Sequence, residues 1–92
     1  MIYNIVVEPE AISDLINIKL FISKDSPNRA NNFITELKDK IKTLQNMPQR
    51  CKKSLYTQVK DSYDLIHKRY TIVYKIINDN VHILTIFRQR AY

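Results

Sequence analysis

A stripe of apolar residues between positions 30 and 44 constrains the fold of this chain more than any other feature. The stripe recurs at the three- and four-residue spacing of one α-helical face, and its members are Ala30, Phe33, Ile34, Leu37, Ile41 and Leu44. Ser26-Pro27 supplies an N-cap and a proline for the first helical position, and Met47-Pro48 predicts the end of the helix. Because such a helix is apolar on one side, it needs a second apolar surface to pack against.

The residues before this helix predict a strand followed by another helix. Residues 2–7 are β-branched and aromatic and stop at Glu8-Pro9, which predicts a first strand. From Pro9 to about Lys24 the apolar residues again follow helical spacing, so the two helices should form an antiparallel hairpin. We interpret the acids near this helix start as capping residues rather than a catalytic pair; they are Glu8, Glu10 and Asp14.

The second half of the chain predicts the surface that the helices need. Residues 63–67, 69–77 and 81–87 are expected to be strands, and Asn78-Asp79-Asn80 suits a tight hairpin turn. Tyr70 and Tyr74 fall on one strand face and should pack under the helices. The chain has no glycine, so Asn and Asp should fill the left-handed turn positions.

These elements define one α+β domain over residues 1–92. The expected order is β-α-α-β-β-β, with the helical hairpin packed on one face of a mainly antiparallel sheet. The other sheet face and the strand ends are expected to be open to solvent. A hydrophobic content of 45% in 92 residues is enough for one modest core.

Composition excludes several classes of function. Cys51 is the only cysteine and only two histidines are present, so neither a disulfide nor a Cys/His metal site is expected. A chain without glycine has no glycine-rich phosphate loop, and we expect no metal and no cofactor. No apolar run approaches the roughly 20 residues that span a bilayer, and no signal peptide is recognisable. We therefore expect a cytoplasmic protein that does not interact with membranes.

Positive charge is concentrated in the second half of the sequence. Residues 1–46 contain six Lys/Arg and six Asp/Glu, whereas residues 47–92 contain nine Lys/Arg and three acids. The whole net charge of +6 therefore lies in residues 47–92. Clustered cations favour a polyanionic or acidic partner that is met by one face of the protein.

Three groups of residues are candidates for contact with that partner. His67-Lys68-Arg69 is predicted at a turn and should face outward, although an ordinary solvated turn is the alternative. Arg88, Arg90 and Tyr92 alternate at the end of the last strand, where they would suit phosphate binding or stacking. Lys52 and Lys53 are either contact residues or simple loop cations. We expect His82 to lie on the sheet surface rather than to act as a base.

The ordered pattern resembles the RelE/ParE toxin superfamily over nearly the whole chain. The similarity begins with Arg-Ala-Asn-Asn-Phe-Ile and the apolar stripe through Pro48, over residues 29–48. It continues through the strand patterns Tyr63-x-Leu65, Tyr70-x-Ile72-Val73-Tyr74 and Val81-x-Ile83-Leu84-x-Ile86-Phe87, and ends with Arg88-Gln89-Arg90-Ala91-Tyr92. The resemblance implies a growth-arresting toxin of a type II toxin–antitoxin system, neutralised by a cognate antitoxin.

Two mechanisms occur in this superfamily, and the resemblance leaves both open. RelE-like members cleave messenger RNA on the ribosome with basic residues and commonly a tyrosine, whereas ParE-like members poison DNA gyrase without a catalytic constellation. RelE-like members carry cations where this chain has Asp64, Ile66 and Thr71. This difference and the long amphipathic helices favour a ParE-like toxin.

The alternatives differ in whether the protein is an enzyme. An endoribonuclease would draw its catalytic residues from His67, Arg88, Arg90 and Tyr92, with Lys68 and Arg69 beside them, because RNA cleavage needs an activated 2′-hydroxyl and a neutralised phosphate. A gyrase inhibitor needs no such set. A third alternative is a non-toxic nucleic-acid-binding module with the same fold.

Overall fold

The computed structural model describes residues 2–53 and 61–88 of the chain. The predicted order of elements is confirmed. A short additional strand and two 3₁₀ turns lie between the second helix and the last three strands. The elements are β1 (Asn4–Val7), α1 (Pro9–Ser23), α2 (Pro27–Lys42), η1 (Thr43–Gln45), η2 (Pro48–Arg50), β2 (Lys52–Lys53), β3 (Ser62–His67), β4 (Tyr70–Ile77) and β5 (Asn80–Arg88). None of the helices in the described ranges is long and apolar enough to cross a membrane.

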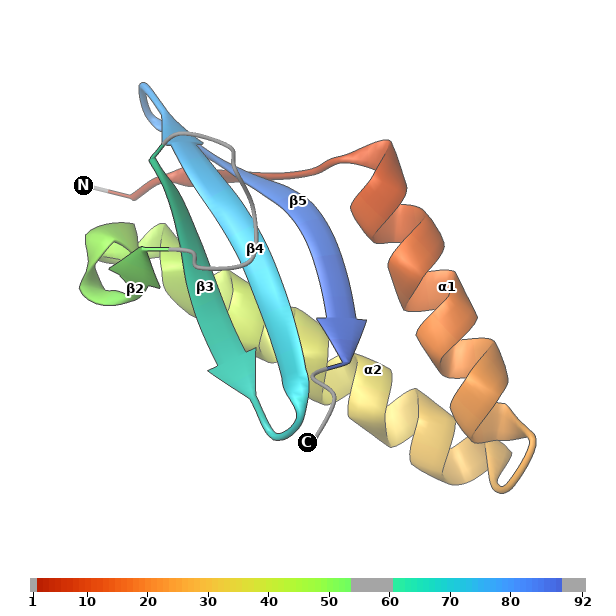
Figure 1. Cartoon of the computed structure of the whole chain (residues 1–92). Coiled ribbons are helices and arrows are strands. Elements are labelled where there is room, and N and C mark those ends of the chain that lie inside the picture. Colours follow the sequence, from red (N-terminus) through yellow and green to blue (C-terminus); the bar gives the residue numbers. More distant parts are fainter. Residues whose placement is uncertain (1, 54–60, 89–92) are drawn as a thin grey trace.

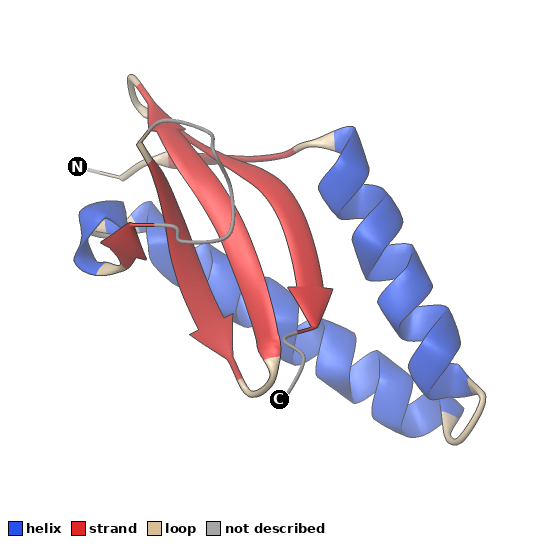
Figure 2. Ribbon diagram, in the orientation of Figure 1, coloured by secondary structure: helices blue, strands red, loops and turns tan. Residues whose placement is uncertain are grey.

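The strands form one five-stranded sheet in the order β1-β5-β4-β3-β2. β1 pairs in parallel with β5, and the other neighbours pair antiparallel, so the sheet is mainly antiparallel as expected. Figure 1 shows α2 crossing one face of the sheet while α1 runs beside β5, and Figure 2 shows the same two-layer arrangement. The predicted α+β fold is confirmed.

The apolar stripe places α2 against the centre of the sheet. The Ser26 hydroxyl accepts a hydrogen bond from the Arg29 backbone N–H at 3.2 Å, which confirms the predicted N-cap. The buried stripe residues pack with strand residues of β4 and β5 in one cluster, which includes Leu37, Ile41, Ile72, Tyr74 and Ile83. The helix ends at Lys42, earlier than predicted, because the last turn tightens into η1 and Met47 takes a left-handed φ of 50° before Pro48.

α1 is attached to β5 by the carboxylates of Glu8 and Asp14, which corrects our interpretation of these two acids as caps, whereas Glu10 lies in the first turn as expected. β1 pairs with β5 only as far as Ile83, and a bulge at the next residue shifts the register. Beyond it the Asp14 carboxylate accepts hydrogen bonds from the Thr85 hydroxyl (2.7 Å) and the Ile86 backbone N–H (2.9 Å). At the N-cap of α1, the Glu8 carboxylate lies 2.7 Å from the Nδ1 atom of His82. Both acids therefore bind the neighbouring strand, and Glu8 forms no side-chain hydrogen bond to the free N–H groups of the helix start.

The two faces of β4 are both largely buried. Tyr74 and Tyr70 lie on the helix-facing side as predicted, and the Tyr74 hydroxyl donates a hydrogen bond to the Pro48 carbonyl. Burial raises the pKa of Tyr74. The expectation that the opposite face is open to solvent is wrong at Thr71 and Val73, which are fully buried. Each of these small side chains lies on the central strand between two cross-strand neighbours.

The left-handed turn positions follow the prediction only in part. Asp61 and Asn78 have positive φ angles, as expected in a chain without glycine. Lys68 and Met47 also have positive φ angles, of 56° and 50°. Lys68 does so because the His67–Tyr70 pair closes the β3–β4 hairpin with only two residues in the turn.

The buried stripe gives a test of this packing. Leu37 is fully buried, so Leu37→Ala should lower the free energy of unfolding by roughly 2–5 kcal/mol through the cavity it leaves. Urea unfolding followed by circular dichroism measures this loss. The neighbouring exposed residue provides the control, because Lys38→Ala should change the stability by less than about 0.5 kcal/mol. A similarly small effect of Leu37→Ala would mean that the stripe does not face the core.

Candidate functional site

A groove of about 660 Å³ opens where the helical hairpin meets the ends of the sheet strands. Its walls come from the end of α1, the first half of α2, the β3–β4 turn and the end of β5. The lining residues are Phe21, Ile22, Asp25, Arg29, Asn32, Phe33, Glu36, Lys68, Arg69, Tyr70 and Arg88. The lining thus combines four cations and two acids with aromatic and aliphatic side chains.

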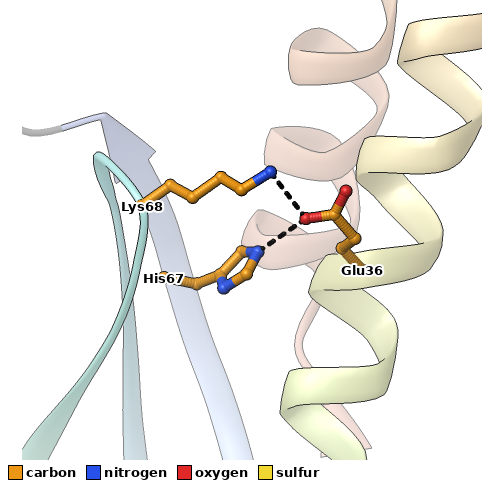
Figure 3. A network of polar contacts seen from close by, with 3 residues as sticks. All are labelled: Glu36, His67 and Lys68. Atoms are coloured by element: carbon orange, nitrogen blue, oxygen red, sulfur yellow. Dashed lines mark hydrogen bonds and ion pairs between the residues drawn. The ribbon is translucent and has the colours of Figure 1, made fainter.

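Glu36 of α2 fixes the position of the β3–β4 turn. Its Oε1 atom lies 3.0 Å from His67 Nε2 and 2.9 Å from Lys68 Nζ. Figure 3 shows both side chains reaching from the hairpin to this carboxylate. His67 belongs to the helix-facing side of β3, which directs its ring towards α2. Our prediction that His67 faces outward is therefore wrong.

Phe33 forms an aromatic contact point beneath the same turn. Its ring stacks on His67 with centroids 6.0 Å apart and packs obliquely against Tyr70 at 5.1 Å. Lys68 Nζ lies 5.6 Å from the Phe33 ring centroid, within cation–π range. Phe33 and Glu36 are one helical turn apart, so a single face of α2 holds the turn by both packing and charge.

The ion pairs alter the acidity of Glu36. Hydrogen bonds from Lys68 and then from His67 hold the pKa of this carboxyl below its ordinary value of 4.5. The Glu36 side chain is 41% exposed, so solvent screens the pairs and their contribution is small. Its negative charge is nevertheless matched locally by Lys68 and does not neutralise the other cations of the groove.

Three arginines supply the remaining positive charge of the groove. Arg88 pairs with Tyr70 across β4 and β5, which places both on the helix-facing side of the sheet. Arg69 belongs to the β3–β4 turn and Arg29 to the first turn of α2. None of the three forms an ion pair within residues 2–53 and 61–88. A groove with exposed guanidinium groups beside aromatic rings suits carboxylates or phosphates of a partner.

The structure brings together only part of the predicted contact set. Lys68, Arg69 and Arg88 line the groove. His67 does not line it but contacts Glu36, which does. Lys52 and Lys53 form β2 and pair with Asp64 and Tyr63 at the sheet edge, outside the groove. Arg90 and Tyr92 fall outside the described residues. In the described part of the chain no group of His, Cys, Asp and Glu could hold a metal ion.

Sequence reasoning missed the helical wall of the groove. Arg29, Phe33 and Glu36 occur at i, i+4 and i+7, which places them along one side of α2. This spacing was visible in the sequence. The apolar stripe accounted for Phe33, however, and nothing local indicated that the neighbouring polar positions face the β3–β4 turn.

The fold is shared with the structures of two toxin–antitoxin systems. The structure is similar to the chromosomal ParDE toxin–antitoxin system from P. aeruginosa, with a TM-score of 0.79, 16% identity, and coverage of 97% of this chain and 98% of that chain. It is also similar to the RelBE2 toxin–antitoxin complex from Mycobacterium tuberculosis, with a TM-score of 0.73, 18% identity, and coverage of 97% and 93%. The TM-scores show a shared fold, and at identities this low the similarity shows nothing beyond the fold.

Sequence comparison gives the family. Residues 5–91 match the family described as ParE toxin of type II toxin–antitoxin system, parDE, while no curated protein matches the chain. The chain therefore belongs to the ParE toxin family. This confirms the resemblance to RelE/ParE toxins that the sequence pattern indicated.

The ion pairs of Glu36 predict a pH-dependent contribution to stability. Because the folded-state pKa is depressed, the contribution is present above the ordinary value of 4.5 and is lost as the pH falls through the lower folded value. Glu36→Gln should therefore be less stable than the parent at neutral pH, and the difference should shrink as the pH falls below about 4.5.

Thermal unfolding between pH 7 and pH 3 measures this difference. Asp39→Asn, on the same helix, provides the control, because Asp39 is exposed and forms no ion pair with another described residue. A Glu36→Gln difference that stays constant over the whole pH range would contradict the assignment.

Proposed function

We propose that this protein arrests bacterial growth by inhibiting DNA gyrase, and that the basic groove contacts its target or its antitoxin. The observation that carries the proposal is the family match over residues 5–91, in a chain with a net charge of +6. The absence of cations at the three positions where RelE-like members carry them also favours gyrase inhibition over RNA cleavage. Asp64 and Thr71 are buried, and Ile66 is apolar, so none of them supplies an exposed positive charge.

A cognate antitoxin is the second partner that we propose. Both similar structures, ParDE and RelBE2, are toxin–antitoxin systems. The exposed arginines of the groove would bind an acidic segment of such a partner, because bidentate contacts between guanidinium and carboxylate groups are strong and directional. In this proposed role the protein is a single toxin domain that acts in the cytoplasm and uses neither a metal nor a cofactor.

A RelE-like endoribonuclease is the second candidate function. The observation in its favour is the gathering of Lys68, Arg69 and Arg88 around the aromatic residues of the groove, which would suit an RNA phosphate and a stacked base. His67 is poorly placed to act as its base, because Nε2 already contacts Glu36. We therefore rank gyrase inhibition first.

Induction of the chain alone in a susceptible bacterium distinguishes these functions. We expect growth arrest in which DNA synthesis stops before protein synthesis and the cells filament, as measured by parallel pulse labelling within minutes of induction. Co-expression of the cognate antitoxin should relieve the arrest. Collapse of protein synthesis first, with ribosome-dependent cuts in messenger RNA, would instead support the endoribonuclease. Unimpaired growth with abundant folded protein would refute both.

The groove itself is tested by removing two of its charges. Arg69→Ala with Arg88→Ala should reduce growth arrest by at least about tenfold, which corresponds to roughly 1.4 kcal/mol of lost binding free energy. The matched control is Lys52→Ala with Lys53→Ala, which removes the same charge outside the groove and should leave the arrest unchanged. Circular dichroism must show that both variants fold. If both double variants lost growth arrest to the same extent, the effect would come from the net charge rather than from the groove.

A further inference from the structure

α1 has a second apolar face that the fold leaves exposed. Ile12, Ile16 and Leu20 are spaced by four residues and are 47%, 55% and 60% exposed. The buried residues of the same helix, Ala11 and Ile18, lie on the other side. A surface helix normally has one apolar face, so this second stripe indicates a surface that is covered by another molecule.

The charges of α1 are separated along its length. Glu10 lies in the first turn and is not bound to β5, whereas Lys19 lies in the second half of the helix and Lys24 is its C-cap residue. α1 also belongs to the half of the sequence that has no net charge, so like-charge repulsion between two copies is weakest there. The acidic Glu10 at one end and the basic Lys24 at the other would come close together if a second copy of α1 packed in the reversed direction.

We propose that this face binds a second copy of the same chain, with the two α1 helices antiparallel across a twofold axis at Ile16. In this arrangement Ile16 meets the partner's Ile16, and Ile12 meets the partner's Leu20. The interface is isologous, because both copies use the same surface: the Ile16 contact lies on the axis, and the contact between Ile12 and Leu20 occurs twice. Ile12, Ile16 and Leu20 thereby cover one another in the two copies.

The same geometry pairs charges at the edge of the stripe. Lys24 lies eight residues after Ile16 and Glu10 lies six residues before it, so Lys24 and the partner's Glu10 differ by about 3 Å along the axis. Both residues lie on the same flank of the helix, within reach of long side chains. Within the described residues neither Glu10 nor Lys24 forms an ion pair, so both are available. A parallel pair of helices would bring like charges together.

The stripe is small and lies away from the exposed arginines. Three side chains per copy bury less than the roughly 800 Å² per partner of a stable complex, so the dimer is weak and depends on concentration. None of the three stripe residues lines the groove. The inference therefore does not depend on the proposed function, and its failure would leave that proposal untouched.

Sedimentation equilibrium of the full chain, made by cell-free synthesis, tests the dimer. The average mass of the parent should rise towards that of a dimer with concentration, and Ile16→Glu should remain monomeric because two carboxylates would meet at the axis. Lys38→Glu, on the exposed side of α2, makes a charge change outside the interface and should associate like the parent. A parent chain that stays monomeric up to ~1 mM would overturn the proposal.

A charge exchange tests the antiparallel orientation. Lys24→Glu and Glu10→Lys should each weaken association by setting like charges opposite each other, and the double variant should restore it. Circular dichroism checks that α1 remains helical in each case. Failure of the double variant to restore association would overturn the orientation.

Cysteine cross-linking locates the axis independently. In a Cys51→Ser background, Ile16→Cys should oxidise readily to a disulfide-linked dimer, since the two positions meet on the axis. Ile12→Cys should cross-link poorly alone and well when combined with Leu20→Cys. If Ile16→Glu instead removes only the binding of the antitoxin to a monomeric chain, the face belongs to the antitoxin and the dimer is refuted.

Discussion

The hydrogen bonds between Asp14 and β5 fix the relation between the helical hairpin and the sheet. β1 covers only the first part of the β5 edge, as far as Ile83, and the bulge that follows would leave the Ile86 N–H without a strand partner. Asp14 accepts from this N–H and from the Thr85 hydroxyl, so α1 continues along the edge where β1 stops. The end of α1 therefore reaches the end of β5, and α2 begins there. Both walls of the groove depend on this contact.

The arginines of the groove stay unpaired with Glu36 because this carboxylate is bound to the β3–β4 turn. Glu36 binds the His67 and Lys68 side chains of the β3–β4 turn, and Phe33 packs beneath them. This use of the carboxylate fixes the turn in place without neutralising Arg69 and Arg88. Because Arg69 lies in the turn that Glu36 holds, the backbone at this arginine is already in place before an anionic partner binds. The same residues that stabilise the fold locally thus maintain a site that can attract a carboxylate or phosphate.

Sequence patterns predicted the elements and the resemblance, but not the contacts between elements. The α2 stripe, the Ser26 cap and the inward side of Tyr74 were predictable because helix and strand periodicity are local properties. The roles of Asp14 and Glu36 were not, since their partners lie 72 and 31 residues away in the chain. The prediction that His67 faces outward was wrong for the same reason. The sequence predicted its place beside the β3–β4 turn but not its contact with α2. The burial of Thr71 and Val73 was not predicted, because the alternation of a strand assigns residues to a face but does not show whether that face is covered.

α1 serves two environments, and its composition reflects both. One side packs against α2 and β5, while the opposite side carries Ile12, Ile16 and Leu20 at the surface. A chain with a net charge of +6 repels its copies in most orientations. Glu10 in the first turn of α1 and Lys24 at its C-cap favour the antiparallel orientation, in which the exposed apolar side chains meet with little repulsion. Charge patterning can therefore restrict an apolar surface to one specific contact and oppose the non-specific association that such a surface would otherwise promote.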